Sequence, residues 1–312
     1  MRIAYVDPWR MAWDRMKLAL FKPFDLGKWF AVGFNAFLAG LMEGRHGSAG
    51  SRYSHEGSWR EFLDFPGRAW GWLNSHPFWF TAIVIGAAAA LAVGIILLWV
   101  SSRAKFMFLD NVIHNAAEIR KPWEKFRKEG NSLFAWTLVF GTIAFAVFIA
   151  FAVFFFIGAR QLYEIEPTRW LSVPLLVGLG LVFFFLILII GYIALFLNGF
   201  VVPLMYKGGL TARQAWARFL ALLGRAPLQF ILYGLMVFVL YLLFVAAVVM
   251  AGIVTCCIGW LLLAIPYIGT VVTLPFWYTL RAFSVEFLGQ FGPEYALFPA
   301  SVSQPQAPPG QA

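Results

Sequence analysis

Histidine and cysteine, the side chains that most often build metal sites and nucleophilic centres, are few in this sequence. The four histidines are scattered, and no pair has a spacing that would gather zinc ligands: His46, His55, His76 and His114. Cys256 and Cys257 are adjacent, and neighbouring cysteines pair only through a strained ring, so we interpret them as two small apolar side chains. The sequence also lacks a nucleophile elbow, a zinc-protease motif, a Walker loop and a dinucleotide fingerprint. We therefore predict a protein that is not an enzyme and that has no metal site and no cofactor.

Polar residues and prolines inside the long apolar runs are the remaining candidates for chemistry. Ionisable residues deep in a bilayer would mark a pathway, and none stands at the centre of a predicted span. Asn35 and Asn198 are interpreted more simply as interhelical hydrogen bonds than as ligands. Pro266 and Pro275 lie in one run, which we expect to depart from a regular helix because each proline lacks an N–H group and crowds the carbonyl four residues back. The carbonyls freed there could line a pathway, so these four residues are the pathway candidates.

Positive charge gathers at the ends of apolar runs, most clearly between residues 206 and 226. Its four cations, with no acid among them, are Lys207, Arg213, Arg218 and Arg225. Thr211 and Gln214 fit a capping box, in which the hydroxyl and the amide satisfy each other's free backbone N–H groups. The apolar and basic side chains that follow fall on opposite sides of a helix. This pattern predicts an amphipathic helix in the membrane surface, with its cations at the lipid headgroups.

A tryptophan two residues before a cation stands ahead of three apolar runs. The three copies are Trp13 with Arg15, Trp123 with Lys125, and Trp216 with Arg218. One interpretation is a threefold repeat of an interfacial helix followed by a transmembrane hairpin. The other is that tryptophan and basic residues simply favour this boundary. Under both interpretations we expect these six side chains, together with the other three cations of residues 206–226, to contact headgroups or the membrane interface.

Composition excludes an ordinary soluble domain. Of the 312 residues, 61% are hydrophobic and only 12% are charged, and the mean hydropathy is +0.76. The net charge of +9 would suit nucleic acid, but the cations lie at the ends of apolar runs. We therefore expect anionic lipid headgroups as the partner and no nucleic acid. The sequence identifies no protein partner.

Runs of about 20 apolar residues are long enough to cross a hydrocarbon core roughly 30 Å thick. We predict an all-α integral membrane protein with six transmembrane helices, arranged as three hairpins, each preceded by an amphipathic interfacial helix. A single polytopic domain covers residues 1–298, and residues 299–312 form a disordered tail. The predicted spans are about 26–42, 77–100, 133–157, 171–197, 228–251 and 260–280.

Several helix boundaries follow from local signals. Asp7 and Pro8 fit an N-cap followed by proline at the first helical position. A second capping box opens at Ser58, and Pro66 is expected to interrupt the amphipathic segment that follows. The helix of the second span is expected to continue into water as far as about Ile119.

The distribution of Lys and Arg predicts the orientation. With six spans, the N-terminal segment, residues 101–130, residues 206–226 and the C-terminal segment share one side and hold 18 of the 24 cations. This bias favours cytoplasmic N- and C-termini in a bacterial inner membrane. An arrangement in which residues 26–42 do not span also satisfies the rule, so charge alone does not decide between the two.

Three stretches resemble those of a family of prokaryotic polytopic membrane proteins that carry a domain of unknown function. They are residues 20–29, residues 200–206 with Ala215 and Trp216, and residues 286–295. More distantly, they are similar to the membrane domain attached to some glycerophosphodiester phosphodiesterases. The resemblance covers nearly the whole chain but implies no activity. The catalytic barrel of those enzymes has no counterpart here, because the sequence has no long soluble segment to form one.

Two classes of function remain. The first is a non-enzymatic membrane protein that acts in membrane organisation or as a partner of envelope proteins. The alternative is a transporter or channel for a small or lipidic substrate. The absence of charge at the centres of the predicted spans favours the first class over an ion-coupled transporter.

Overall fold

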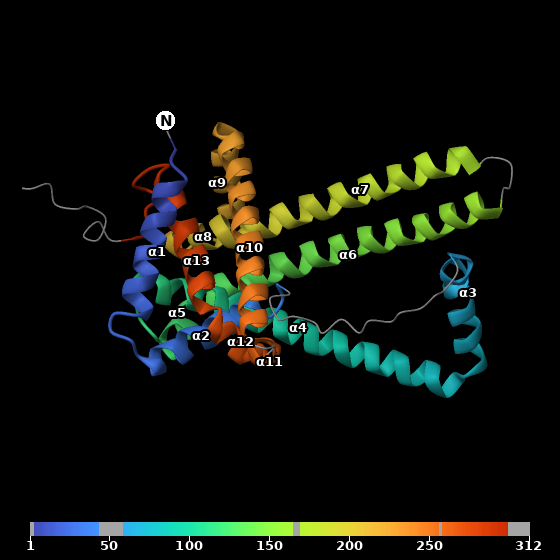
Figure 1. The fold of residues 1–312 in the computed structure, drawn as a ribbon, viewed down its shortest axis with the longest axis horizontal. Helices are drawn as coiled ribbons and strands as arrows, with labels where there is room; N and C mark the ends of the chain where they lie inside the picture. The colour runs from blue at the N-terminus through green and yellow to red at the C-terminus, as the bar shows by residue number, and fades with distance from the viewer. Residues whose placement is uncertain (1–2, 44–58, 165–168, 256–257, 299–312) are drawn as a thin grey trace, which may run out of the picture. The chain divides into compact units, whose positions relative to one another are not determined.

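The computed structural model describes residues 3–43, 59–164, 169–255 and 258–298, and these are helical with short connections. The all-α prediction is therefore confirmed for this part of the chain. The described residues form two compact units (Figure 1). The first unit draws on Met1–Ser48, Leu98–Trp136 and Leu195–Ala312, and the second on Ala49–Leu97 and Thr137–Ala194. The predicted tail at 299–312 lies outside the described residues.

Four helices in the described residues are long and apolar enough to cross a membrane, and the prediction of six is wrong. They are Pro77–His114, Arg127–Gly158, Val177–Gly208 and Pro227–Val254. The expected first span is the helix α2 (Leu26–Gly40), which has only 15 residues. The expected sixth span is divided among three short helices. Four long apolar helices indicate a multi-pass membrane protein.

The helix α2 packs mainly on α12 (Pro266–Val272) and α13 (Leu274–Gly289), and its C-terminal end also contacts the last third of α4 (Pro77–His114). Ser101 Oγ donates to the carbonyl of Ala39 at 2.9 Å, and Lys105 Nζ pairs with Glu43 at 3.1 Å. The last third of α4 carries buried polar and charged residues, namely Ser101, Ser102, Arg103, Lys105, Asp110 and Asn111. Arg103 donates to Asn131 and Asp110 accepts from Tyr206, so segments other than α2 also cover them. With 38 residues, α4 extends about 57 Å, far more than a bilayer core requires.

Several of the predicted helix boundaries differ from those in the structure. The helix α1 (Val6–Leu20) forms as expected, but its cap residue is Tyr5, which makes no side-chain capping bond, so the Asp7 cap is wrong. The helix α3 (Trp59–Ser75) continues through Pro66 rather than breaking there. The capping box at Ser58 lies outside the described residues. The helix α4 ends at His114, before the expected Ile119, because Asn115 adopts a left-handed φ of 53°.

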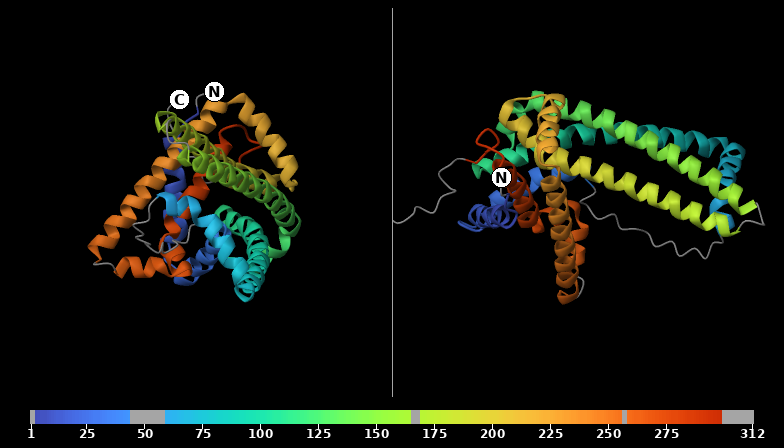
Figure 2. Two further views of the ribbon diagram at one scale, coloured as in Figure 1. Left: turned by 90° about the vertical axis from the view of Figure 1, so that its right-hand side faces the viewer. Right: turned by 90° about the horizontal axis from the view of Figure 1, so that it is seen from above.

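In the second unit, α6 (Arg127–Glu164) and α7 (Arg169–Phe196) run side by side (Figure 2). Phe183 lies between them, with ring centroids 5.9 Å from Phe148 and 5.0 Å from Phe151. Their outer apolar side chains are exposed, as lipid contact requires. Beyond α7 the chain enters a π-helical turn (Leu197–Val201) and then α8 (Val202–Gly208).

The helix α10 (Pro227–Val254) is followed by three shorter helices that run back beside it. They are α11 (Ile258–Ala264), α12 (Pro266–Val272) and α13 (Leu274–Gly289). The Phe244 and Phe276 rings stack at 3.9 Å, and Tyr233 packs on Phe283 at 5.2 Å nearer the start of α10. Pro266 begins α12 and Pro275 lies in the first turn of α13. The predicted departure from a regular helix between these prolines is therefore confirmed. Proline is tolerated in a first helical turn because the N–H groups there have no partner inside the helix.

Aromatic side chains form the core of the first unit. Phe200 is fully buried, and its ring centroid lies 4.8–5.4 Å from those of Phe219, Phe230 and Tyr233. This cluster fixes α9 (Ala212–Arg225) by one face against the π-helical turn and α10. The short helix α5 (Arg120–Lys125) precedes α6.

Candidate anion-binding site

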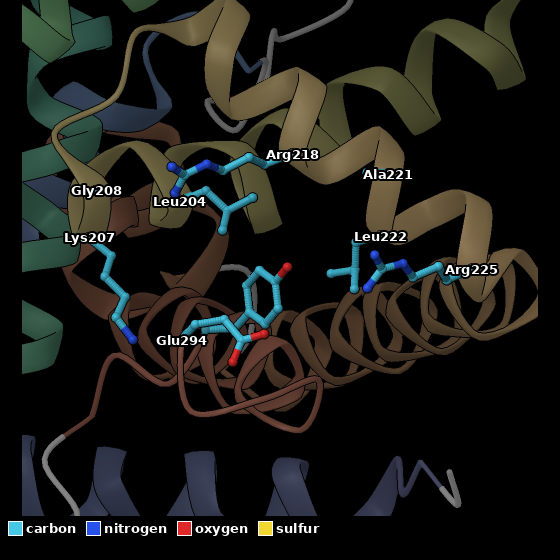
Figure 3. A pocket seen from close by; sticks show the side chains of 9 residues that line it. Leu204, Lys207, Gly208, Arg218, Ala221, Leu222, Arg225 and Glu294 are labelled. Carbon is cyan, nitrogen blue, oxygen red and sulfur yellow. The ribbon is translucent and has the colours of Figure 1, made fainter.

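A pocket of about 290 Å³ lies between α8, α9 and the segment that follows α13 (Figure 3). It is lined by Leu204, Lys207, Gly208, Arg218, Ala221, Leu222, Arg225, Glu294 and Tyr295. Three of the four cations predicted to share a membrane-surface segment therefore line one pocket. The fourth, Arg213, is exposed on α9 but does not line the pocket.

Local sequence explains why α8 and α9 enclose this space. Gly209 has a φ of 58°, a left-handed conformation that glycine adopts without a steric penalty, and it ends α8. Thr211 and Gln214 then form the predicted capping box, with Thr211 N donating to Gln214 Oε1 at 3.0 Å and Gln214 N to Thr211 Oγ1 at 3.4 Å. Ser132 Oγ accepts the N–H of Ala212 at 2.9 Å, so α9 begins at a fixed point.

The cations come from two elements. Arg218 and Arg225 are seven residues apart on α9, almost two full turns, so they share a face of that helix. Lys207 Nζ donates to the carbonyls of Pro293 at 2.9 Å and Ala296 at 2.7 Å, and it thereby holds the C-terminal segment against α8. In Figure 3, Glu294 lies between Lys207 and Arg225.

The charges in the pocket are not balanced inside the protein. Among the residues that the structure describes, no carboxylate lies within ion-pair distance of Lys207, Arg218 or Arg225. Glu294 is the only acid in the lining. Arginine presents a planar fork of donors that suits carboxylate and phosphate oxygens, and both arginines here are exposed to solvent. The arrangement is suited to binding an anion.

Along the chain, the pocket lies at the ends of two candidate spans. Lys207 and Gly208 end the candidate span Val177–Gly208, and Arg225 stands two residues before the candidate span Pro227–Val254. Cations at the ends of spans lie at the depth of lipid headgroups.

In the other two copies of the tryptophan–cation motif, the cation contacts side chains of the protein itself. Arg15 Nε lies 2.6 Å from Glu286 Oε1, and its guanidinium carbon lies 3.8 Å from the Phe298 ring centroid. Lys125 Nζ lies 3.7 Å from Asp110 Oδ1 and also above the Phe126 ring.

The three tryptophans of the motif make aromatic contacts. Trp13 is 41% exposed and stacks on Trp9. Trp123 packs edge-on against Trp99, and Trp216 stacks on Trp136 at 5.2 Å. Trp216 is only half-buried, and its indole Nε1 has no hydrogen-bond partner among the described residues.

The four pathway candidates do not gather at one site. Asn35 is fully buried and donates at 3.3 Å to the carbonyl of Glu118, which lies in the connection between α4 and α5, so this bond does not join two helices. Asn198 lies in the π-helical turn. Pro266 and Pro275 stand at helix starts, and their carbonyls accept the hydroxyls of Thr270 and Thr279.

Sequence reasoning missed a buried cation, Arg281 on α13. Its guanidinium donates to the carbonyl of Asn198 in the π-helical turn and to that of Lys105 at 3.1 Å. A π-helical turn leaves backbone carbonyls out of the α-helical pattern, and here an arginine binds one of them. In the sequence, Arg281 is only a basic residue just after the last predicted span. Such a residue is equally typical of a cation at the membrane boundary.

The sequence was compared with known proteins. Residues 4–298 match a family of unknown function, DUF7544. No curated protein and no solved structure matches the chain. Because the match spans nearly the entire chain, this multi-pass membrane protein belongs to the DUF7544 family of unknown function.

Proposed function

We propose that this protein is a non-enzymatic component of the bacterial inner membrane that holds an anionic lipid headgroup in the pocket between α8 and α9. In this role it contributes to membrane organisation, alone or as a partner of other envelope proteins. The observation that carries the proposal is that Lys207, Arg218 and Arg225 line one pocket at the ends of two candidate spans. Three cations with a single acid attract anions, and at that depth the abundant anions are lipid phosphates.

Replacing Arg218 and Arg225 together with glutamine is expected to weaken retention of anionic phospholipid by the purified protein about fivefold or more, because both cations would face the headgroup. Retention is measured by native mass spectrometry after titration of phosphatidylglycerol in neutral detergent. Arg213→Gln is the matched control, since it removes a cation from the same helix outside the pocket. Equal losses in the control and the double variant would mean that general surface charge, and not the pocket, binds lipid.

We further propose that the connections on either side of α5 and α9 face the cytoplasm. The support is the cation excess of residues 101–130 and 206–226. The cytoplasmic termini expected with six spans do not follow from the four candidate spans, which put both termini on the side opposite to these connections. Reporter fusions at Glu129 and Arg213 should be retained inside the cell, and a fusion at Thr168 should be exported. An exported reporter at Arg213 would overturn this orientation.

The rival proposal is a transporter or channel for a small or lipidic substrate. What favours it is the broken return path of α11, α12 and α13, since discontinuous helices often build substrate sites. Against it, threonine hydroxyls already occupy backbone carbonyls near the breaks, including Thr273 Oγ1 to the carbonyl of Gly269 at 2.7 Å. Substrate-dependent flux through proteoliposomes would favour the transporter or channel over the non-enzymatic, headgroup-binding protein.

A further inference from the structure

We propose that the pocket formed by Lys207, Arg218 and Arg225 selects a phosphate monoester over a phosphate diester. This inference rests on the proposed function, because it names the class of headgroup that the same pocket takes. Two observations carry it: a comparison of the three tryptophan–cation motifs, and the balance of charges and donors in the pocket.

The three motifs occupy equivalent positions on their helices. The residue before each tryptophan is buried, and so is the residue after each cation. These residues are Ala12 and Met16, Pro122 and Phe126, and Ala215 and Phe219. The cations Arg15, Lys125 and Arg218 therefore sit in the same register relative to the protein interior.

In two of the three motifs a carboxylate from another helix neutralises the cation. Glu286 of α13 does so for Arg15 at 2.6 Å, and Asp110 of α4 does so for Lys125 at 3.7 Å. In the third, no carboxylate among the described residues pairs with Arg218, which instead lines the pocket. An anion from outside the protein would take the place that a side-chain carboxylate has in the other two motifs.

The charge of the lining fits a dianion. Lys207, Arg218 and Arg225 are opposed only by Glu294, which leaves two positive charges. A phosphodiester headgroup carries one negative charge, whereas a phosphate monoester carries about −1.5 to −2 at neutral pH and has three terminal oxygens. A monoester therefore neutralises the pocket more completely.

The donors also fit. Each arginine offers a fork of N–H groups that no described residue accepts. Lys207 has already given two of its three N–H groups to Pro293 and Ala296, so one N–H remains for a ligand. The pocket therefore keeps unpaired N–H donors for the oxygens of an anion.

The monoester could belong to a lipid such as phosphatidic acid or to a soluble molecule such as glycerol 3-phosphate, and both present the same group. The test titrates the full-length protein in neutral detergent with short-chain phosphatidic acid and, separately, with short-chain phosphatidylglycerol. The expected result is about two- to fivefold tighter binding of phosphatidic acid. The preference should disappear below the second phosphate pKa of about 6, where the monoester loses its extra charge.

The variants separate this inference from the proposal on which it rests. Arg218→Gln and, independently, Arg225→Gln should abolish the preference, while Arg213→Gln should keep it. Equal binding of the two lipids by the native protein would overturn the monoester inference and leave headgroup binding intact. If neither lipid binds more tightly to the native protein than to the double variant Arg218→Gln/Arg225→Gln, both fail.

Competition identifies the source of the monoester. If glycerol 3-phosphate displaces phosphatidic acid and binds with similar affinity, the ligand is a soluble monoester. If it does not displace the lipid, the acyl chains contribute and the ligand is a lipid. Either result supports selection of a monoester.

Discussion

Replacing Phe219 with alanine is expected to destabilise the protein by about 3–5 kcal/mol, because the substitution leaves a cavity in a fully buried aromatic cluster. The Phe219 ring centroid lies 5.2 Å from those of Phe196 and Phe230 and 5.4 Å from that of Phe200. The midpoint of thermal unfolding in neutral detergent should fall by about 10 °C. Adding Trp216→Ala should lower it further, since that ring packs on Phe219.

Two controls accompany this prediction. Leu220→Ala changes a neighbouring side chain that is 54% exposed, and it should shift the midpoint little in detergent. Arg213→Gln with Arg218→Gln removes two exposed cations from α9 and should leave the protein folded. If that double variant proves less stable than Phe219→Ala, the cations are structural, and their assignment to headgroups is wrong.

The second large effect is expected at the pair Arg15–Glu286, where Arg15→Met alone should cost about 3 kcal/mol. The two side chains are only 14% and 11% exposed, so removing the cation leaves a poorly solvated carboxylate. Combining Arg15→Met with Glu286→Gln should restore part of the loss. The thermal midpoints of the native protein, of each single variant, Arg15→Met and Glu286→Gln, and of the double variant give the coupling between the two sites.

A second ion pair on α1 is the matched control. Lys17 and Asp14 are 49% and 57% exposed, and Lys17→Met should change the midpoint by much less. Equal effects of Arg15→Met and Lys17→Met would show that the contact between α1 and α13 does not depend on the buried pair.

Features set by neighbouring residues could be predicted from the sequence. The capping box of Thr211 and Gln214 depends on residues three apart, and the buried face of α9 follows from helical periodicity. That periodicity placed Ala215, Trp216, Phe219, Leu222 and Leu223 on one side. Three of them, Ala215, Phe219 and Leu222, are buried, and Trp216 and Leu223 are half-buried. The break near Pro266 was predictable for the same reason, because proline acts on its own turn of the helix.

Features set by distant packing could not be predicted. The pocket needs residues 293–296 beside α8, and nothing near Lys207 in the sequence indicates that its ammonium binds the carbonyls of Pro293 and Ala296. The error over α2 has a similar origin. Its apolar composition suits a short membrane span, but it also suits packing against α12 and α13, and only those contacts with distant parts of the chain decide between the two.

The packing of α1 against α13 has a consequence for biosynthesis. Arg15 and Glu286 are separated by 271 positions in the chain, and Trp9 and Phe283 meet in the same contact. The first helix leaves the ribosome long before its partner is translated. Its buried face, with Ala12 and Met16, must stay covered by lipid or by a chaperone during that interval. Nascent chains that stop before α13 should therefore be substrates for membrane proteases, and release of the finished chain should end that susceptibility.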